Sequence, residues 1–476
     1  MRTSDLISFE WKLQFRRCSS FLLLAAFALV LIYGSLAGKA ERDERVAAIG
    51  DHYLQIEAGM ESWLEDLREL ERLGTEADVP PWAGSAMDVT FATSLHQEPL
   101  ADFAVGQSDL LPYAGAVSLW DPDIRLFSKY EFADPVSLAM GSFDISKAVI
   151  LFLPLILIVF CFDVIAADRD ANRLGLTIAQ GVSIKRLFWQ RLLFRASIVL
   201  LVTLATALLA LVIGQGEEGL GARLPAFGFW SLLVLIYASF WILLIAFVAS
   251  INKSSEFNVL ALLGLWVGLT LVIPAATSAM AEALYPTPSR LAYLADARQV
   301  ENETRLQEAD VANQFMLDHP ELLVNQESLI PAFVLSSFLV TSTVDSATQP
   351  IVESFEEALQ RRESVIALFC YLSPAIAAHS LFNELAGTSG QRHQAYLAQA
   401  RQFKAEYAKL VGPNIVSKQP INSGFYQTIP KFQFQDRSLA TRLGQGLGPL
   451  ALLFLLSIGM GCVANRRLQT TSPISS

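Results

Sequence analysis

The chain reads DVIAADRDANRLG over residues 163–175 and IAQGVSIKRLFWQR over residues 178–191, between two strongly apolar segments. No other part of the sequence has such a density of basic residues: Arg169, Arg173, Lys185, Arg186, Arg191 and Arg195. Short loops rich in lysine and arginine stay on the cytoplasmic side of a membrane. The stretch is therefore predicted to be a cytoplasmic loop between two membrane spans.

This loop also contains a helical pattern. Gly181 interrupts the preceding pattern, and Ser183 can cap a new helix. Apolar residues then recur at helical spacing: Ile184, Leu187, Phe188 and Leu192. The pattern predicts a short amphipathic helix at the inner face of the membrane. Its basic residues alone are equally consistent with fixing the topology and binding anionic lipid.

The composition indicates a membrane protein with sizeable parts in water. Of 476 residues, 53% are hydrophobic and 17% are charged, and the mean hydropathy is +0.41. A helix of about 20 apolar residues crosses a hydrocarbon layer of about 30 Å. Six runs meet this length: residues 19–37, 146–166, 195–214, 228–250, 257–280 and 443–464. The first is expected to remain as an anchor, because no convincing cleavage site follows it.

The remaining short loops agree on the orientation. Arg16 and Arg17 precede the first span, Lys253 follows the fourth, and Arg466 and Arg467 follow the sixth. All of them would lie inside with the basic loop, so both termini are predicted to be cytoplasmic.

The predicted fold is an all-α polytopic membrane protein with six transmembrane helices and two mainly helical extracytoplasmic inserts, residues 38–145 and 281–442. The other predicted parts are a cytoplasmic amphipathic helix at 1–18, the block of spans at 146–280 with its basic loop at 167–194, and a tail at 465–476. The net charge of −11 comes largely from the first insert and argues against nucleic acid as a partner. Cys370 is the only cysteine well inside an insert, so no disulfide is expected there.

The first insert begins with a heptad pattern: Val46, Ile49, Tyr53, Ile56, Met60, Trp63, Leu67 and Leu70. It predicts a helix of about 30 residues that rises about 45 Å from the membrane. The apolar stripe needs a partner, which is either the chain's own insert or another subunit. A short strand or extended link is expected over 87–93.

The second insert is predicted to be helical around residues 293–311 and 396–410. Residues 329–340 are apolar but too short to span, as in a buried or surface helix. Residues 363–385 are the main alternative for a seventh span. We reject it because of Pro374, His379 and the charged flanks, and because an odd count would place the C-terminal arginines outside.

The sequence contains no energy source of its own. It has no GxxxxGK[ST] phosphate loop and no HExxH zinc motif, so the chain is not expected to be an enzyme. No ionisable residue lies in the middle of a span, which disfavours coupling to protons or ions. His379 and His393 could form a metal site, although ordinary packing roles suit them better. A turn or cap role suits Ser108 and Asp109 better than a nucleophilic one.

Four stretches resemble the type-2 ABC transporter permeases, in the branch with two large extracytoplasmic inserts that is catalogued as a domain of unknown function. They are GQSDLLP at 106–112; DRD at 168–170 with LTIAQGVS at 176–183; LSPA at 372–375; and NELAGT at 383–388. The resemblance implies that the basic loop holds a coupling helix that docks on an ATPase. Asp168 and Arg169 match the acidic-basic pair of that loop. Asn172 and Arg173 stand where Gly-Thr is usual, and Arg191 replaces a customary lysine.

The resemblance assigns two sets of site residues. The ATPase-coupling set is Asp168, Arg169, Gly181, Ser183, Lys185, Arg186 and Arg191. The extracytoplasmic motif set is Gly106, Gln107, Ser108, Asp109, Pro112, Ser373 and Pro374. No catalytic, cofactor or metal residues are assigned, and ATP and Mg²⁺ are expected to bind only to the partner ATPase.

The function expected from these features is that of the permease subunit of an ATP-driven ABC exporter in the cytoplasmic (inner) membrane of a bacterium. The expected partners are ABC ATPase subunits, a second copy or a sister permease, and membrane lipid. The alternative is mechanotransmission, in which ATP hydrolysis inside moves the long arm and acts on an extracytoplasmic protein without transport. Smooth apolar spans suit a lipid-like cargo, but they suit any membrane helix equally well.

Overall fold

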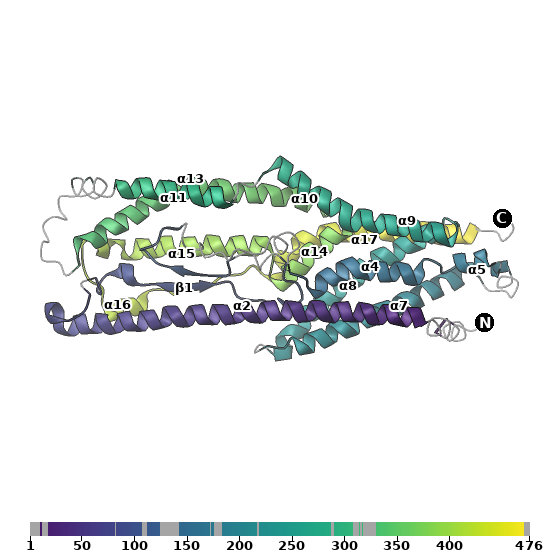
Figure 1. Cartoon of the computed structure of the whole chain (residues 1–476), viewed down its shortest axis with the longest axis horizontal. Helices are drawn as coiled ribbons and strands as arrows, with labels where there is room; N and C mark the ends of the chain where they lie inside the picture. Colours follow the sequence, from purple (N-terminus) through teal and green to yellow (C-terminus); the bar gives the residue numbers. More distant parts are fainter. Residues whose placement is uncertain are drawn as a thin grey trace.

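The computed structural model describes residues 10–11, 18–80, 82–106, 112–123, 142–171, 173–175, 183–216, 219–286, 290–307, 314, 317 and 330–470. Most of the predicted N-terminal helix at 1–18 therefore lies outside the described residues, as do Gly181 and Gln107 to Asp109. The molecule is elongated, with a helical bundle in one half and a projecting half of helices and short strands in the other (Figure 1).

The bundle consists of apolar helices. They are the first part of α2 (Cys18–Leu73), α4 (Ile145–Cys161), α5 (Ala166–Asp170), α7 (Ile184–Ile213), α8 (Gly219–Ala249), α9 (Ser255–Val267), α10 (Ile273–Leu284) and α17 (Leu439–Thr470). A π-helical turn, η5 (Gly268–Val272), joins α9 to α10. α2 begins and α17 ends at the same end of the bundle, which we call the basal end (Figure 1). The opposite end, where the bundle meets the projecting half, is called the junction.

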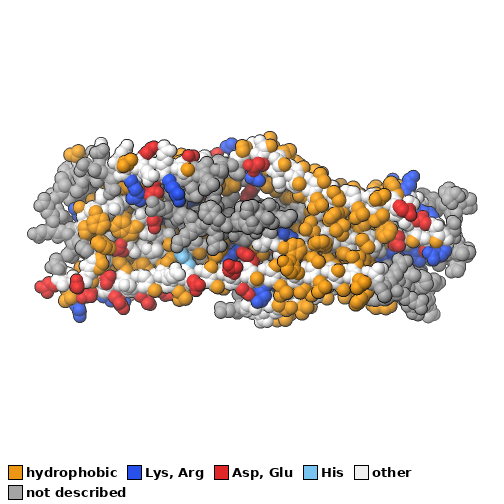
Figure 2. Space-filling model, viewed as in Figure 1, with side chains coloured by type: hydrophobic (Ala, Val, Ile, Leu, Met, Phe, Trp, Pro, Cys, Tyr) orange, Lys and Arg blue, Asp and Glu red, His pale blue; other side chains and the backbone are white. Residues whose placement is uncertain are grey.

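Six helices are long and apolar enough to cross a membrane: Ser19–Leu73, Ile145–Asp170, Ile184–Ile213, Gly219–Ala249, Ser255–Leu284 and Gly446–Gln469. Each of the six predicted spans overlaps one of these helices. The second crosses the turn between α4 and α5, and the fifth runs through α9, η5 and α10. On the face drawn in Figure 2, hydrophobic side chains cover most of the bundle, whereas acidic and basic side chains lie over the projecting half and at the basal end. Both findings are typical of a multi-pass membrane protein.

α2 is a single helix of 56 residues, about 84 Å long at about 1.5 Å per residue (Figure 1). The predicted first span at 19–37 and the predicted arm are thus one continuous element, because no proline interrupts it and only scattered glycines do. Met60, Trp63 and Leu67 of the heptad stripe are buried in the core of the projecting half. The stripe therefore packs against the chain's own inserts, which was one of the two alternatives.

The remainder of the first insert is less helical than predicted. Its described part contains short 3₁₀ turns and two antiparallel strands, β1 (Phe91–Ser94) and β2 (Ala114–Val117). β1 overlaps the extended segment that the sequence predicts. In the described part of this insert, the prediction of mainly helical structure thus holds for the α2 arm alone.

The second insert forms α11 (Arg290–Leu306), α13 (Ala332–Phe369), α14 (Pro374–Ala386), α15 (Gly390–Val416) and α16 (Ser423–Thr428). The apolar segment at 329–340 forms the start of α13, where Val334, Leu335 and Val340 are buried. The rejected seventh span at 363–385 is divided between α13 and α14 and is not among the candidate spans. α14 packs against α17, α8 and α4, so it connects the second insert to the bundle.

Candidate functional site

At the basal end, two arginines of α7 pair with three carboxylates. Arg191 Nη1 lies 2.6 Å from Asp168 Oδ2, and Arg191 Nε lies 2.7 Å from Glu10 Oε1. Arg195 Nη1 lies 2.6 Å from Asp163 Oδ1, and its Nε lies 3.2 Å from Glu10 Oε2. These ion pairs, which we call the basal cluster, tie the N-terminal segment and the end of α4 and α5 to α7.

Arg169 and Asp170, which follow Asp168, bind a second loop. Arg169 Nη1 donates to the side-chain oxygen of Asn252 at 2.7 Å and Nη2 to the carbonyl of Lys253. Asp170 accepts from the hydroxyl of Ser255 at 2.6 Å and from its backbone N–H at 3.1 Å. The loop between α8 and α9 is thereby held against α5, so the two short loops at this end form one platform.

The predicted amphipathic helix is not a separate element. It forms the first turns of α7, which continues for 30 residues into the third span. No glycine or proline occurs between Ile184 and Ile213, so nothing in the sequence ends the helix at the membrane. Ser183 is the N-cap residue, as expected, but its side chain makes no capping hydrogen bond.

The ATPase-coupling residues therefore separate into two groups. Asp168, Arg169 and Arg191 hold the platform together through their contacts within the chain. Lys185 is half-buried and Arg186 is exposed, both in the first turn of α7. Arg186 is thus exposed at the basal end, as are Asp170, Arg173 and Lys253 of the two loops.

At the junction, a buried ion pair connects the first insert to the bundle. Asp102 accepts two hydrogen bonds from Arg223 Nη2 of α8, at 2.7 and 2.6 Å, and both side chains are 1% exposed. The carbonyl of Gly214, which follows α7 directly, accepts from Arg42 Nη1 of α2 at 2.6 Å and from Arg223 Nη1. We did not predict this group from the sequence; the available signal was a lone acid in the apolar stretch 100–105.

Two of the family-like stretches meet at the same junction. Gly106 has a φ of +64°, and a Cβ built there would lie 3.2 Å from the side chain of Asn383 and from the carbonyl of Thr388. The hydroxyl of Thr388 donates to the carbonyl of Ala104 at 2.8 Å. Glycine is needed because both the left-handed backbone and the close approach exclude a side chain. Pro112 lies just before β2.

A third stretch fastens α14 to the fifth span. Ser373 is the N-cap of α14, accepts from the backbone N–H of Ile376 at 3.3 Å, and donates to the carbonyl of Leu269 at 2.6 Å. Pro374 occupies the first turn, where its missing N–H is not needed. Leu269 belongs to the π-helical turn η5, and such turns often occur at functional sites. The junction therefore holds an irregular turn of a span in place.

Burial shifts the pKa of two titratable side chains at the junction. The Asp144 carboxylate caps α4, accepting from the backbone N–H of Lys147 at 2.7 Å and of Val105 at 3.1 Å. Burial raises the pKa of Asp144 against these opposing contacts. Burial, together with the charge of Lys147, lowers the pKa of His379 to about 4. His379 is therefore neutral at neutral pH.

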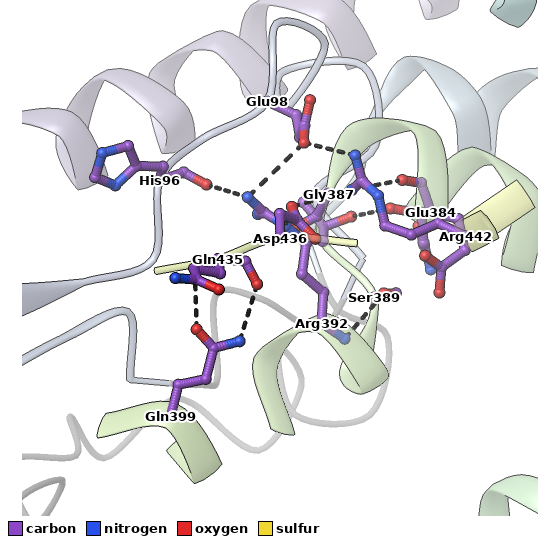
Figure 3. A network of polar contacts seen from close by, with 12 residues as sticks. His96, Glu98, Glu384, Gly387, Ser389, Arg392, Gln399, Gln435, Asp436 and Arg442 are labelled. Atoms are coloured by element: carbon purple, nitrogen blue, oxygen red, sulfur yellow. Dashed lines mark hydrogen bonds and ion pairs between the residues drawn. The ribbon is translucent and has the colours of Figure 1, made fainter. Parts of the chain in front are cut away.

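A network around Arg392 and Arg442 joins both inserts to the start of α17 (Figure 3). Arg392 Nε lies 2.5 Å from Asp436 Oδ2, and Nη2 donates to the carbonyl of His96 at 2.7 Å. Arg442 Nη2 lies 2.6 Å from Glu98 Oε1. Both arginine side chains are buried, so each carboxylate is held by a largely desolvated cation.

Within the described residues, no group of three or more histidine, cysteine, aspartate or glutamate side chains could hold a metal ion. His379 lies 3.2 Å from the amide nitrogen of Asn383, and the ring of His393 lies beside that of Tyr396. Of the motif residues, Gln107, Ser108 and Asp109 lie outside the described part.

Comparison with known proteins gives one match. Residues 290–435 match the model of a family described as a domain of unknown function (DUF3526). The matched range begins with α11 and ends just before α17, so it falls within the predicted second insert. No curated protein and no solved structure matches the chain.

Proposed function

We propose that the chain is the permease subunit of an ATP-driven ABC exporter and works with a separate ATPase subunit. The observation that carries this proposal is the path of α7. Its first turn presents Lys185 and Arg186 at the basal end, and its last turn leads directly to Gly214, where α2 and α8 are fastened. The sequence resemblance to type-2 permeases supports the same assignment.

The basal cluster gives this helix a mechanical role. Arg191 pairs with Asp168 of α5, and Arg195 pairs with Asp163, which follows α4. A displacement of the first turn of α7 would therefore move α5 and the end of α4 with it. Closure of the ATPase subunits would supply that push. The bundle would then shift between two packings, as helices do in switching membrane proteins. ATP and Mg²⁺ would bind to the ATPase alone.

The proposed complex contains two ATPase subunits and two permeases, which are either two copies of this chain or this chain and a sister. It would lie in the cytoplasmic membrane of a bacterium, with the basal end inside and the projecting half outside. This orientation follows from the basic residues of the short loops.

The test is to purify the tagged chain in mild detergent, identify the copurifying proteins by mass spectrometry, and measure ATP hydrolysis in the eluate. We expect an ATPase subunit with vanadate-sensitive hydrolysis. The double variant Lys185→Glu/Arg186→Glu should lower its recovery by about tenfold, because the charges at the docking turn are reversed.

The matched control is Lys409→Glu/Lys431→Glu, which reverses two exposed charges of the projecting half. It should leave recovery of the ATPase unchanged. Equal recovery with both double variants would remove α7 as the docking element, and a preparation free of any ATPase in every detergent would contradict the whole proposal.

Mechanotransmission is a second candidate, favoured by the uninterrupted α2 helix. It runs from the basal end of the bundle to the far end of the projecting half (Figure 1). Spin labels at Glu65 of α2 and Glu406 of α15, both exposed, would report on this region. Mechanotransmission predicts a change in their distance between the ATP-free and vanadate-trapped complexes. An unchanged distance during active hydrolysis would favour export alone.

A further inference from the structure

A cavity of about 330 Å³ lies between α13 and α15 in the projecting half. Leu119, Phe338 and Val352 are among the apolar residues of its wall, and the polar residues are mainly charged or hydroxyl side chains. The volume falls at the lower end of the range for small-molecule sites, about 300–1,000 Å³. The mixed lining is also typical of such sites.

The charges at this cavity are unbalanced. Lys404 Nζ lies 2.8 Å from both Asp123 Oδ1 and Asp345 Oδ2, and the lysine side chain is only 4% exposed. The other cation of the wall, Arg401, pairs with Glu356. Two carboxylates therefore share one ammonium group, which leaves one surplus negative charge. Burial raises the pKa of Asp345, and the neighbouring Asp123 charge adds to this effect.

One oxygen of this carboxylate pair remains available. Asp345 uses both oxygens, since Oδ1 accepts from the backbone N–H of Asp123 at 2.6 Å and Oδ2 from Lys404. Asp123 uses only Oδ1 within the part of the chain that the structure describes. A cation entering the cavity could pair with Asp123 Oδ2 without displacing an existing contact.

A polar side chain of the cavity wall provides independent evidence for a ligand. Thr341 lines the cavity, is 4% exposed, and makes no hydrogen bond with any described residue. Thr343 and Thr348 on the same helix donate to the carbonyl four residues earlier, at 2.7 and 2.8 Å. Thr341 thus offers a polar contact that the chain itself leaves unused.

We propose that this cavity binds a small organic cation, whose ammonium group pairs with Asp123 and whose apolar body lies against Leu119 and Phe338. A polar substituent on that body would reach Thr341. The proposal goes beyond the exporter function and does not require it, because binding alone is measured. Its failure would leave the recovery of an ATPase unaffected.

The test uses the full-length chain in detergent, titrated with 2-phenylethylammonium, and follows binding by ligand-observed NMR and calorimetry. Two probes of matched shape, neutral 2-phenylethanol and anionic phenylacetate, separate charge from hydrophobic burial. We expect saturable binding of the cation that is at least about tenfold tighter than that of either matched probe.

Two variants and a control locate the site. Asp123→Asn should weaken binding of the cation by about tenfold, and Ala405→Phe should abolish it by filling the cavity from an exposed position of its wall. The control is Glu406→Gln, which removes one negative charge, as Asp123→Asn does, from the exposed residue next to Ala405. It should leave binding of the cation unchanged. Equal affinity for the three probes, no saturable binding, or full binding by both cavity variants would overturn the proposal.

Discussion

The two ends of the bundle are both fastened by arginine–carboxylate pairs, but the pairs differ in burial and in the segments they join. At the junction, Asp102 and Arg223 are each 1% exposed and come from distant parts of the sequence. At the basal end, Asp168 is 18% exposed and pairs with Arg191, although Glu10 and Arg195 of the same cluster are buried. A partly exposed pair can rearrange when a partner docks, whereas a buried pair moves as a unit with its surroundings.

The difference suggests a division of labour. Under the proposed function, the basal end would present charge to the ATPase and adapt to it, and the junction would transmit the resulting motion without coming apart. α7 connects the two, because its first turn lies in the platform and its C-cap, Gly214, lies in the junction. Each prediction below tests one side of this contrast.

Asp102→Ala should have the largest effect. It leaves the Arg223 guanidinium buried without its carboxylate, and breaking a buried pair in this way costs about 3–5 kcal/mol of unfolding free energy. Thermal unfolding in detergent measures this loss of stability. The double variant Asp102→Leu/Arg223→Leu should recover much of the loss. A single variant as stable as the parent would show that the junction is not fastened by this pair.

His379 provides a pH-dependent test of the junction. Its pKa of about 4 in the folded chain lies below the ordinary 6.5, so the unfolded chain binds a proton that the folded chain does not. Stability should therefore fall as the pH decreases from 6.5 to 4, by up to about 3 kcal/mol. His379→Gln should lack this loss. If the unfolding free energies of the parent and the variant changed with pH in the same way, the burial assigned to His379 would be wrong.

Ser373→Ala should have an intermediate effect. The variant loses the cap of α14 and the hydrogen bond to Leu269, which together are expected to cost about 1–2 kcal/mol. Hydrogen exchange should increase in α14 and η5 and remain unchanged at the basal end. Ser417→Ala, which removes a hydroxyl exposed at the end of α15, is the matched control. Equal exchange in both variants would exclude Ser373 as a fastening residue.

Asp168→Asn should have the smallest effect on stability, within about 1 kcal/mol, because the pair is partly exposed and Arg191 retains Glu10. Its effect on coupled ATP hydrolysis should be larger than its effect on unfolding, since the platform would be loosened. Thermal unfolding and hydrolysis are measured on the same preparation. A large stability loss here would remove the contrast between the two ends.

The bundle could be predicted from the sequence because membrane spans depend on local composition alone. Runs of about 20 apolar residues gave all six helices, and the Met60–Leu67 stripe gave a buried face of α2. The continuity of α2 and of α7 was missed. Both predictions ended a helix at the membrane surface. The hydrogen bonds of a helix lie within its own backbone, so the helix can continue from the membrane into water.

The junction could be predicted only in part. The stretches around Gly106, Ser373 and Asn383 were selected by resemblance. The structure brings Gly106 against Asn383 and Thr388, whereas Ser373 binds Leu269 at the other end of α14. The pairing of Asp102 with Arg223 joins residues 121 positions apart, and no local pattern specifies such a contact. The lone acid in an apolar stretch indicated a buried partner without identifying it.

The central claim is that nucleotide-driven change at the basal end reaches the junction. The most direct measurement is hydrogen exchange of the copurified complex, with and without ATP and vanadate, at residues 98–106 and 383–392. We predict that exchange at both segments changes on trapping, and that Lys185→Glu/Arg186→Glu abolishes the change. Unaltered exchange at both segments in a complex that hydrolyses ATP would contradict the claim.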